Sequence, residues 1–402
     1  MFEPIPITNF NYSLPDHRIA KFPLNRRDET KLLVMYDGRI TDTGFNKLPD
    51  FVPSNSIFIF NNTRVIKARL VFHKSEGARI EIFCLNEEHA GEGYAVWKCY
   101  VGNAKKWKQN DLYLEDQNSH TALSASRESI EGDTYLVKFK WNSALSFEEV
   151  LEIFGNVPLP PYINREPVAD DRERYQTIYA RHDGSVAAPT AGLHFTDQVF
   201  EGLKKKGSSF DYLTLHVGAG TFKPVTSANA AEHSMHEEKV IINRDMLLRL
   251  IQNFQQTIIS VGTTSMRSLE SIYWLGHQLI HSIHTHQHPV GDFKIDQWYP
   301  YQQKGNISSI EALSAVYDFM KQHNLKEMSG YTQIMIVPGY KFRICNALIT
   351  NFHQPQSTLL LLVAAFIGDH WKRAYDHALD NDYRFLSYGD SCLFFNHHKH
   401  DS

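Results

Sequence analysis

A change in the hydrophobic pattern near residue 146, from short strand-like runs to alternating helices and strands, constrains the fold more than any other feature of this chain. Between residues 65 and 145, short alternating or β-branched runs recur, separated by Gly, Asn, Asp and Lys. Short strands at this spacing predict a small antiparallel sheet or barrel. The runs cover residues 65–72, 78–85, 94–101, 111–114 and 134–139.

Beyond residue 146 the predicted elements alternate between helices and strands, which is typical of an α/β layer fold. Helices are predicted at 146–155, 196–206, 244–254, 309–323 and from 358 towards 379, and strands at 212–217, 257–261 and 334–337. Another strand is predicted earlier, at 57–60. We therefore predict an α/β body made of residues 1–64 and 146–402. Residues 65–145 are expected to be inserted into it as a small antiparallel β-barrel domain.

Composition places few further limits on function. The chain has 402 residues, is 42% hydrophobic and 21% charged, and carries a net charge of −4. That total neither favours nor excludes nucleic acid, because an acidic chain can carry a local basic patch. The four cysteines are scattered without a CxxC pair, which suits a reducing compartment. No signal peptide is evident, and the longest apolar run, 359–367, is far shorter than the ~20 residues of a membrane span. We expect a cytoplasmic protein without a membrane partner.

Two Gly-rich segments, residues 184–195 and 214–222, predict a binding site. Each combines two glycines and one histidine with small residues, which let a ligand approach the backbone. The candidate contacts are Ser185, Thr190, His194, His216, Gly218 and Gly220. The alternatives are two tight structural loops and, for His216, a hydrogen-bonded interior histidine.

A third segment has the pattern of an anion site. The strand 257–261 leads into a Gly-Thr-Thr-Ser turn that contains Thr263 and Thr264, and a helix with Arg267 follows. Free N–H groups and the dipole at a helix start favour a phosphate or carboxylate, although a plain N-cap remains the alternative. Neither a Walker A loop nor a GxGxxG dinucleotide motif is present.

Candidate acid–base groups lie in residues 233–238, which supply His236 and Glu238 among two imidazoles and two carboxylates. A metal is the rival interpretation, but the HxxH spacing is not that of a zinc protease and no cysteine is near. Five further histidines lie within twelve residues at the start of a His- and Gln-rich stretch, residues 277–330, which we interpret as an extended excursion from the body. They are His277, His281, His284, His286 and His288.

A basic cluster in the β-rich stretch combines Lys105, Lys106 and Lys108 with Trp107. Lysines can contact phosphates, and a tryptophan can stack on a base. The alternative is a solvated surface.

Together these segments closely resemble one family, the queuosine-pathway S-adenosylmethionine:tRNA ribosyltransferase-isomerases. The matching stretches occur in family order over nearly the whole chain. They are residues 32–34, 61–65, 68–70, 158–163, 175–177, 185–195, 214–222, 233–238, 261–271, 338–340, 350–353, 357–360 and 383–390.

The resemblance implies transfer and isomerisation of the ribosyl group of S-adenosylmethionine, which is a co-substrate, without a metal. The implied acceptor is the aminomethyl group of 7-aminomethyl-7-deazaguanine in the tRNA wobble position, and the products are epoxyqueuosine-tRNA, adenine and methionine. His236, Glu238 and His353 become the acid–base candidates. The two Gly-rich loops, with Thr263, Thr264 and Arg267, would bind S-adenosylmethionine. Arg64 and the three lysines would contact tRNA, and we expect a monomer.

The chain departs from the family pattern at several positions. Most members carry an acidic residue where this chain has Asn346, and Gln354 replaces a usual leucine. A Gly-Gly pair is here Gly77-Ala78, and residues 277–330 are longer than the usual connection. A tRNA-binding paralogue without turnover and a transferase acting on another acceptor therefore remain alternatives.

Overall fold

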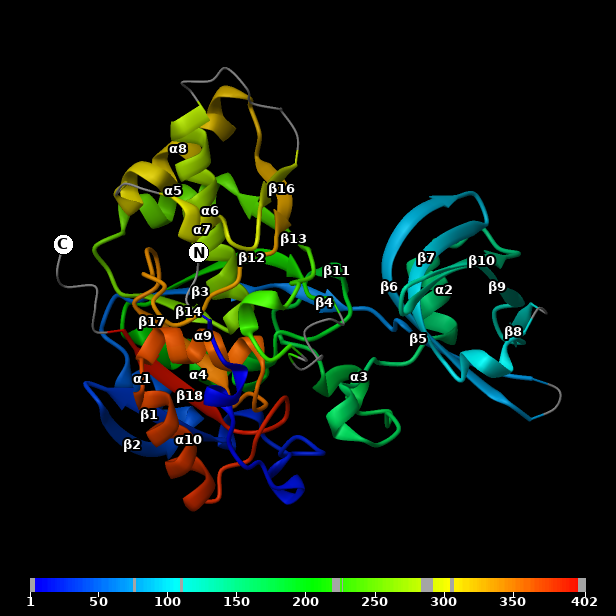
Figure 1. Ribbon diagram of the computed structural model, residues 1–402, viewed down its shortest axis with the longest axis horizontal. Coiled ribbons are helices and arrows are strands. Elements are labelled where there is room, and N and C mark those ends of the chain that lie inside the picture. Colours follow the sequence, from blue (N-terminus) through cyan, green and yellow to red (C-terminus); the bar gives the residue numbers. More distant parts are fainter. Residues whose placement is uncertain are drawn as a thin grey trace. The chain divides into compact units, whose positions relative to one another are not determined.

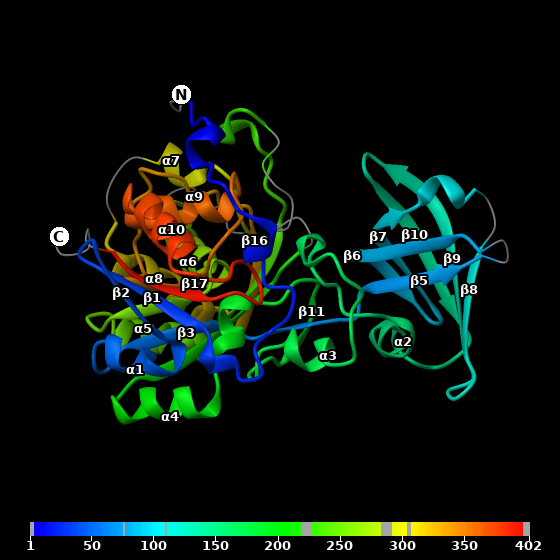
Figure 2. The same ribbon diagram turned by 90° about the horizontal axis from the view of Figure 1, so that it is seen from below.

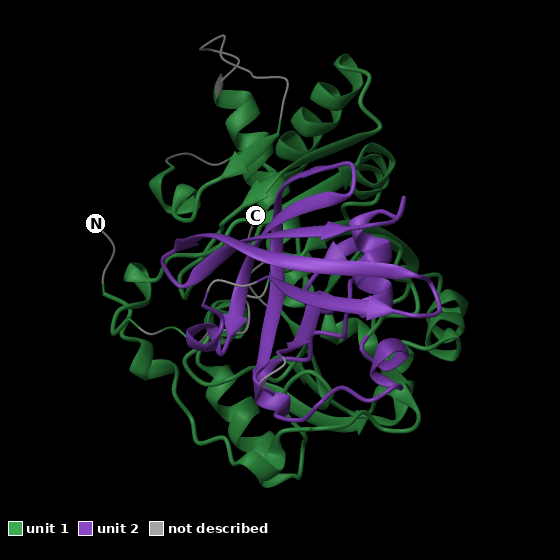
Figure 3. Ribbon diagram, turned by 90° about the vertical axis from the view of Figure 1, so that its right-hand side faces the viewer, with its two compact units in different colours: residues 1–63, 176–182, 189–402 green, residues 64–175, 183–188 purple. Residues whose placement is uncertain are grey.

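The computed structural model divides the chain into two compact units, coloured separately in Figure 3. The larger unit contains residues 1–63, 176–182 and 189–402, and the smaller contains residues 64–175 and 183–188. The structure describes residues 4–74, 77–108, 111–218, 225, 227–282, 292–303 and 307–396. The smaller unit thus holds residues 146–175 and 183–188 in addition to the β-rich stretch. The boundaries expected at 65 and 145 stay a prediction.

A ten-stranded mixed sheet forms the centre of the larger unit (Figure 1). In spatial order its strands are β15 (Phe293–Ile295), β16 (Glu327–Thr332), β13 (Glu238–Asn243), β12 (Ser209–His216), β3 (Ile57–Asn61), β14 (Ile258–Val261), β17 (Ala347–Asn351), β18 (Ser391–Phe395), β1 (Lys31–Tyr36) and β2 (Arg39–Gly44). The four central strands β12, β3, β14 and β17 are mutually parallel, and every residue of β3, β14 and β17 is buried. Strands buried on both faces are expected where helices cover a parallel sheet.

Helices cover both faces of this sheet (Figure 2). One face packs on α1 (Leu48–Phe51) and α4 (Asp197–Lys205) through an apolar cluster that includes Phe58, Phe60 and Leu203. On the opposite side lie α9 (Thr358–Ile367) and α10 (His370–Asp380). The 20-residue helix α6 (Thr263–Ser282) packs on β12, β14, β15 and β17. The remaining helices of this unit are α5 (Arg244–Gln252), α7 (Tyr299–Gln302) and α8 (Ser309–Gln322).

The parallel central strands all end at one edge of the sheet, which we call the carboxyl edge. Strands β15 and β16 end there too, while the antiparallel neighbours β13 and β18 begin there. Ligands of open α/β sheets bind beyond the carboxyl ends of their strands. The sheet topology therefore locates the expected site at this edge.

The smaller unit is built on an antiparallel, barrel-like sheet. Its strands are, in order, β5 (Arg69–His73), β6 (Arg79–Gly91), β7 (Tyr94–Gly102), β10 (Thr134–Trp141), β9 (Thr121–Glu131) and β8 (Leu112–Asp116). It also holds α2 (Phe147–Phe154), which begins at a capping box formed by Ser146 and Glu149, and α3 (Asp171–Arg174). Two short strands, β4 (Thr63–Val65) and β11 (His182–Ser185), contain points where the chain passes between units. The predicted α/β class with a small antiparallel β sheet is confirmed.

Two predicted elements are wrong. The apolar run 334–337 is irregular and follows β16, because its backbone bonds go to side chains and loops rather than to a neighbouring strand. The helix expected from 358 to 379 breaks into α9 and α10 at Gly368, whose φ of +61° suits glycine and ends a helix.

Candidate active site

Most of the larger-unit residues singled out from sequence lie along the carboxyl edge. His216 ends β12, Glu238 begins β13, and Thr263 and Thr264 follow β14 at the start of α6. His353 follows β17 by two residues. Segments far apart in the sequence are therefore brought together along one row, which is the arrangement that a single ligand site requires.

Glu238 and Arg267 form a buried ion pair at this edge. Their exposed fractions are 4% and 5%, and Arg267 Nη1 donates to a Glu238 carboxylate oxygen. Arg267 Nε donates to the carbonyl oxygen of Ile334 at 3.2 Å. The remaining Nη2 is buried, and no partner for it lies among the described residues. Because a buried guanidinium donor without an acceptor is costly, Nη2 can donate favourably to an anionic ligand.

Asn61 fixes the ends of β3 and β12. Its Nδ2 donates to the Leu215 carbonyl at 2.9 Å, and its Oδ1 accepts from the Leu215 N–H at 3.0 Å. The carboxamide thereby replaces a backbone peptide and continues the pairing of the two strands. Thr63 Oγ1, two residues on, lies 3.0 Å from His216 Nδ1. Burial lowers the pKa of His216 to about 4, helped by Lys239 and His182, so its imidazole is neutral.

His194 lies in the 3₁₀ helix η7 (Thr190–His194) and is buried. Asn351 Nδ2 donates to its Nε2 at 3.0 Å, which leaves Nδ1 to donate to Thr30 Oγ1 at 2.9 Å. Burial lowers the pKa of His194 to about 3. Both ring nitrogens are therefore occupied, but Oδ1 of Asn351 is buried without a partner among the described residues. That oxygen adds an acceptor that sequence reasoning did not single out.

His353 is held in a different part of the edge. Its ring Nε2 lies 2.9 Å from Thr350 Oγ1. Its backbone N–H donates to the Tyr375 hydroxyl at 3.0 Å, and its backbone carbonyl accepts from the Tyr12 hydroxyl. Burial lowers its pKa to about 3. The strand that precedes it, β17, is four strands away from β13, roughly 19 Å at the usual strand spacing. The structure therefore does not bring His353 to Glu238.

The start of α6 has the strand–turn–helix geometry expected from sequence. Gly262 adopts a φ of +94°, and its N–H donates to the Ile349 carbonyl at 2.8 Å. Thr263 and Thr264 are buried in the first turn. Hydroxyls of Ser265 and Ser268 bond to carbonyls of the preceding turn, at 2.8 and 3.0 Å.

Other predicted residues are more scattered. His236 is exposed, in the irregular segment before β13. Thr190 and Gly218 are half-buried in the larger unit, and Gly220 lies outside the described residues. Ser185 and Arg64 belong to the smaller unit. Ser185 Oγ donates to the Ala187 carbonyl at 2.7 Å, and half-exposed Arg64 lies 3.9 Å from Asp183.

The basic cluster of the smaller unit has exposed lysines but a buried aromatic. Lys105 and Lys106 lie in the 3₁₀ helix η5 (Ala104–Lys106), and Lys108 follows Trp107. The proposed stacking of Trp107 on a base is wrong, because its side chain is only 2% exposed. Lys74 and Arg127 add charge nearby, since their side chains donate to the carbonyls of residues 106 and 108.

The environment of Asn346 explains a departure from the family pattern. Asn346 lies just before β17, and its Oδ1 accepts from the Ile258 N–H at 2.9 Å where β14 begins. It is therefore at the opposite end of these strands from the carboxyl edge. An aspartate could accept the same bond, so the residue joins two strands rather than touching the site.

Glu270 is a buried residue that sequence reasoning missed. Its carboxylate accepts from the Tyr340 hydroxyl at 2.9 Å and from the N–H groups of Arg343 and Ile344 at 2.9 and 3.0 Å. It thus orders the chain that leads into β17. Only its place on the buried face of the predicted helix could have indicated this role.

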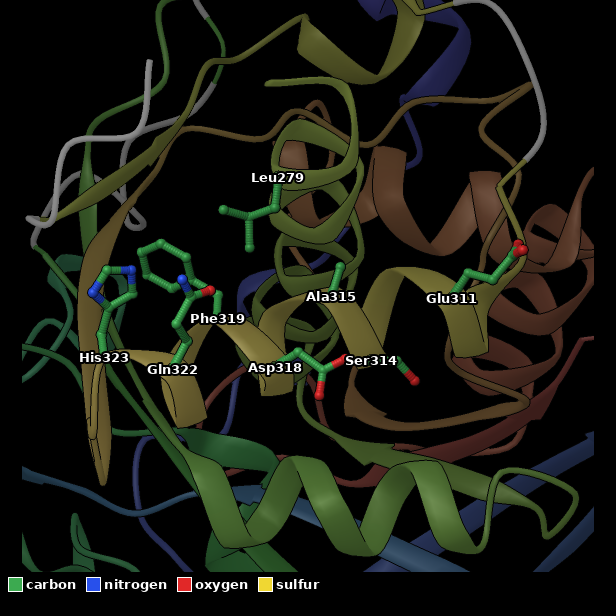
Figure 4. A pocket seen from close by; sticks show the side chains of 8 residues that line it. All are labelled: Leu279, Glu311, Ser314, Ala315, Asp318, Phe319, Gln322 and His323. Carbon is green, nitrogen blue, oxygen red and sulfur yellow. The ribbon is translucent and has the colours of Figure 1, made fainter. Parts of the chain in front are cut away.

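A pocket on the larger unit lies away from the candidate site (Figure 4). It is lined by Leu279, Glu311, Ser314, Ala315, Asp318, Phe319, Gln322 and His323, which come from α6, from α8 and from the residue that follows α8. Leu279 is sixteen residues beyond Thr263 on α6, about 24 Å along the helix axis. None of the residues predicted for the site lines this pocket.

Three further observations bear on the expectations from sequence. All four cysteines are buried free thiols. Within the described ranges, no three His, Cys, Asp or Glu side chains are grouped to hold a metal ion. Among the helices of the described residues, none is both long and apolar enough to cross a bilayer. His284, His286 and His288 lie outside the described residues.

Comparison with known proteins agrees with the resemblance seen in the sequence. A family model described as "Queuosine biosynthesis protein" matches residues 7–394. Among solved structures, the chain is similar to an S-adenosylmethionine tRNA ribosyltransferase from Thermotoga maritima. The two are 27% identical over 96% of this chain and 99% of the other, with a TM-score of 0.46. Since the family model spans nearly the whole chain, including every described segment of the carboxyl edge, this protein belongs to the queuosine biosynthesis family.

Proposed function

We propose that this protein is an S-adenosylmethionine:tRNA ribosyltransferase-isomerase. It transfers and isomerises the ribosyl group of S-adenosylmethionine onto the aminomethyl group of 7-aminomethyl-7-deazaguanine in the tRNA wobble position. Epoxyqueuosine-tRNA, adenine and methionine are the products. The protein acts in the cytoplasm, as a monomer and without a metal.

The observation that carries this proposal is the position of the family's polar motifs along one edge of one sheet. The reaction needs an anion site for the methionine carboxylate and a base for the ribose carbon next to the sulfonium. It also needs a proton for the departing adenine. The carboxyl edge supplies candidates for each demand.

Arg267, Thr263 and Thr264 are the candidates for holding the methionine carboxylate. Arg267 Nη2, which has no partner within the described part of the chain, fits a carboxylate oxygen, and the α6 N-terminus adds N–H donors. Ser185, Thr190, His216, Gly218 and Gly220 are assigned to the rest of S-adenosylmethionine. His194 is assigned a supporting role, because its Nε2 orients Asn351 and leaves Asn351 Oδ1 available to accept from a ligand N–H or O–H.

Candidates for the acid–base work lie in two separate places. His236 and Glu238 are two residues apart where β13 begins, and Glu238 is kept in place by Arg267. His353, four strands away, is neutral because burial lowers its pKa to about 3. The ribose carbon and the adenine ring of one S-adenosylmethionine molecule are much closer together than these two positions, so His353 and the segment of His236 and Glu238 are alternative candidates for the acid–base work.

Lys105, Lys106 and Lys108 are assigned to tRNA phosphates, and Arg64 to a phosphate or carboxylate. All four side chains are exposed and carry charge, which is what backbone contacts require. No residue of this surface is assigned to stack on a base, because the side chain of Trp107 is buried.

The proposal is tested by incubating the purified protein with S-adenosylmethionine and tRNA carrying the deazaguanine precursor. Free adenine is quantified, and the tRNA nucleosides are analysed by mass spectrometry. Epoxyqueuosine formed one for one with adenine supports the proposal. S-adenosylhomocysteine would indicate a methyl transferase, and product on a free base but not on tRNA would indicate another acceptor. Tight tRNA binding without adenine release would indicate a non-catalytic paralogue.

A further inference from the structure

The segment that carries His236 has a defined conformation without regular secondary structure. Residues 233–237 connect the 3₁₀ helix η9 (Ala230–Glu232) to β13. Within it, His233 and Met235 are half-buried, whereas Ser234 and His236 are exposed. An alternation of this kind means that one side of an extended segment rests on another part of the chain.

Gln297 provides that support with both ends of its carboxamide. Its Nε2 donates to the His233 carbonyl at 2.6 Å, and its Oε1 accepts from the Met235 N–H at 2.9 Å. Gln333 adds a third bond, from Nε2 to the Met235 carbonyl at 3.1 Å. The backbone immediately before His236 is therefore held at three polar groups.

Gln297 is itself fixed by the sheet. It follows β15 by two residues, and its carbonyl accepts from the Met335 N–H at 3.1 Å. The Gln333 N–H donates to the carbonyl of Ile295 at 2.9 Å, so the parallel pairing of β15 and β16 continues past the strands. The two glutamines thus approach residues 233–235 from a rigid frame.

Two more contacts join the same pair of segments. Lys294, on β15, forms an ion pair with Glu237. The Met235 side chain packs on an apolar cluster together with Trp298 and Tyr301. Support therefore comes from residues 294–301 at positions 235 and 237 as well, on either side of His236.

From these contacts we infer that Gln297 is a positioning residue that holds His236 for its acid–base role, an inference that rests on the proposed function. It also gives residues 292–303 of the long connection a purpose: they fix the segment from which His236 projects. The imidazole is left exposed at the carboxyl edge while its backbone is immobilised. A misplacement of about 1 Å in a catalytic group can lower a rate by ~100-fold, so such support has a measurable value.

The bidentate contact makes a chemical demand that separates Gln297 from an ordinary packing residue. The site needs one donor, towards the His233 carbonyl, and one acceptor, towards the Met235 N–H. Glutamate meets the demand only when it is protonated, since a carboxylate has no donor. Methionine has a similar length and meets neither part. Gln302, at the exposed end of α7, is a matched control because it is five residues away and outside these contacts.

The test compares Gln297→Met, Gln297→Glu and Gln302→Met with the wild-type protein. Hydrogen exchange of peptides covering residues 230–238 is measured by mass spectrometry, and kcat and KM for adenine release are measured between pH 5 and 8. We expect Gln297→Met to speed exchange in this peptide and to lower kcat by about 10- to 100-fold, with KM for S-adenosylmethionine within about threefold. The kcat ratio of Gln297→Glu to wild type should rise as pH falls, while that of Gln297→Met stays flat. Gln302→Met should match wild type throughout.

Faster exchange with an unchanged kcat in Gln297→Met would overturn the inference and leave Gln297 a purely structural residue. Unchanged exchange would overturn it as well, because the segment would then be held without Gln297. A kcat ratio for Gln297→Glu that does not vary with pH would remove the bidentate explanation. A wild-type protein that releases no adenine would instead refute the proposed function and, with it, the catalytic purpose of this support.

Discussion

The Glu238 carboxylate neutralises the Arg267 guanidinium inside the protein, joining the first residue of β13 to the second turn of α6. One partner is a predicted acid–base group and the other a predicted carboxylate anchor. Their pairing means that a change in either alters both the charge and the position of the other. The two roles have to be tested together.

Breaking this pair should cost stability unless both charges are removed. Glu238→Gln leaves a buried, uncompensated Arg267, so we expect the free energy of unfolding to fall by about 3 kcal/mol. The double variant Glu238→Gln with Arg267→Met should recover much of that loss. Urea unfolding of wild type, both single variants and the double variant measures the coupling. Additive losses would show that the two side chains do not interact.

Buried neutral histidines should make the protein sensitive to acid. The pKa of His194 is about 3 in the folded protein against an ordinary 6.5. Because the folded value is the lower one, the stabilising contribution is complete above pH 6.5 and is lost as pH falls from 6.5 towards 3. This residue alone should add a slope of about 1.4 kcal/mol per pH unit in that window. Urea unfolding at several pH values should show a flatter slope in His194→Leu than in the wild-type protein, and equal slopes would contradict this prediction.

The two Gly-rich loops offer a matched pair of substitutions. A Cβ at Gly192 would lie 1.9 Å from the buried Tyr179 hydroxyl oxygen, whereas one at Gly218 would meet nothing within 4 Å among the residues that the structure describes. Gly192→Ala should therefore lower the free energy of unfolding by about 2 kcal/mol, and Gly218→Ala by no more than about 0.5 kcal/mol. Gly218→Ala should nevertheless raise KM for S-adenosylmethionine, since a ligand is expected to approach its backbone. An unchanged KM would remove Gly218 from the binding site.

Asn346→Asp should change activity and stability very little. The carboxylate can accept the same bond from the Ile258 N–H, far from the carboxyl edge, so we expect kcat within about threefold of wild type and stability within about 1 kcal/mol. Asn346→Leu, which cannot accept the bond, should lose about 1–3 kcal/mol. Steady-state kinetics and urea unfolding measure both effects. A large gain of activity in Asn346→Asp would show instead that a carboxylate at this position takes part in the reaction.

The three lysines of the smaller unit should contribute to tRNA affinity through charge alone. Replacing Lys105, Lys106 and Lys108 with alanine should weaken binding and reduce the slope of log affinity against log salt by about 1 for each phosphate that is no longer neutralised. Alanine at Lys204, Lys205 and Lys206 removes the same charge from the end of α4 and should change the slope less. Equal effects of the two triple variants would show only a general loss of positive charge.

The sequence predicted most helices and turns because these elements are determined largely by residues that are close together in the chain. The helix predicted at 146–155 is α2, which begins at the capping box of Ser146 and Glu149, and the single glycine and three hydroxyls at 262–265 predicted the turn that leads into α6. The long strand β9 was missed because its Ser, Ala and Glu residues favour strands weakly, and pairing with β8 and β10 decides its conformation. The order of the strands in the sheet could not be predicted from local patterns either, because it depends on pairing between segments far apart in the sequence.

Site residues were harder to anticipate for the same reason. Nothing near Gln297 or Asn61 indicates which backbone groups their carboxamides will meet, since those partners lie far away in the sequence. From sequence, Trp107 next to three lysines suggests a binding surface, and only the structure shows that its side chain is buried. Motifs shared with a family identified the segments, and only the fold placed them relative to each other.

The most direct test of the central claim follows the ribose carbons of S-adenosylmethionine. The protein is given S-adenosylmethionine labelled with ¹³C in the ribose, together with precursor tRNA, and the mass of the modified nucleoside is measured by mass spectrometry. We predict that the full ribose label appears in the wobble nucleoside and in neither adenine nor methionine. A wobble nucleoside without the label, or tRNA that gains only a methyl group, would contradict the account.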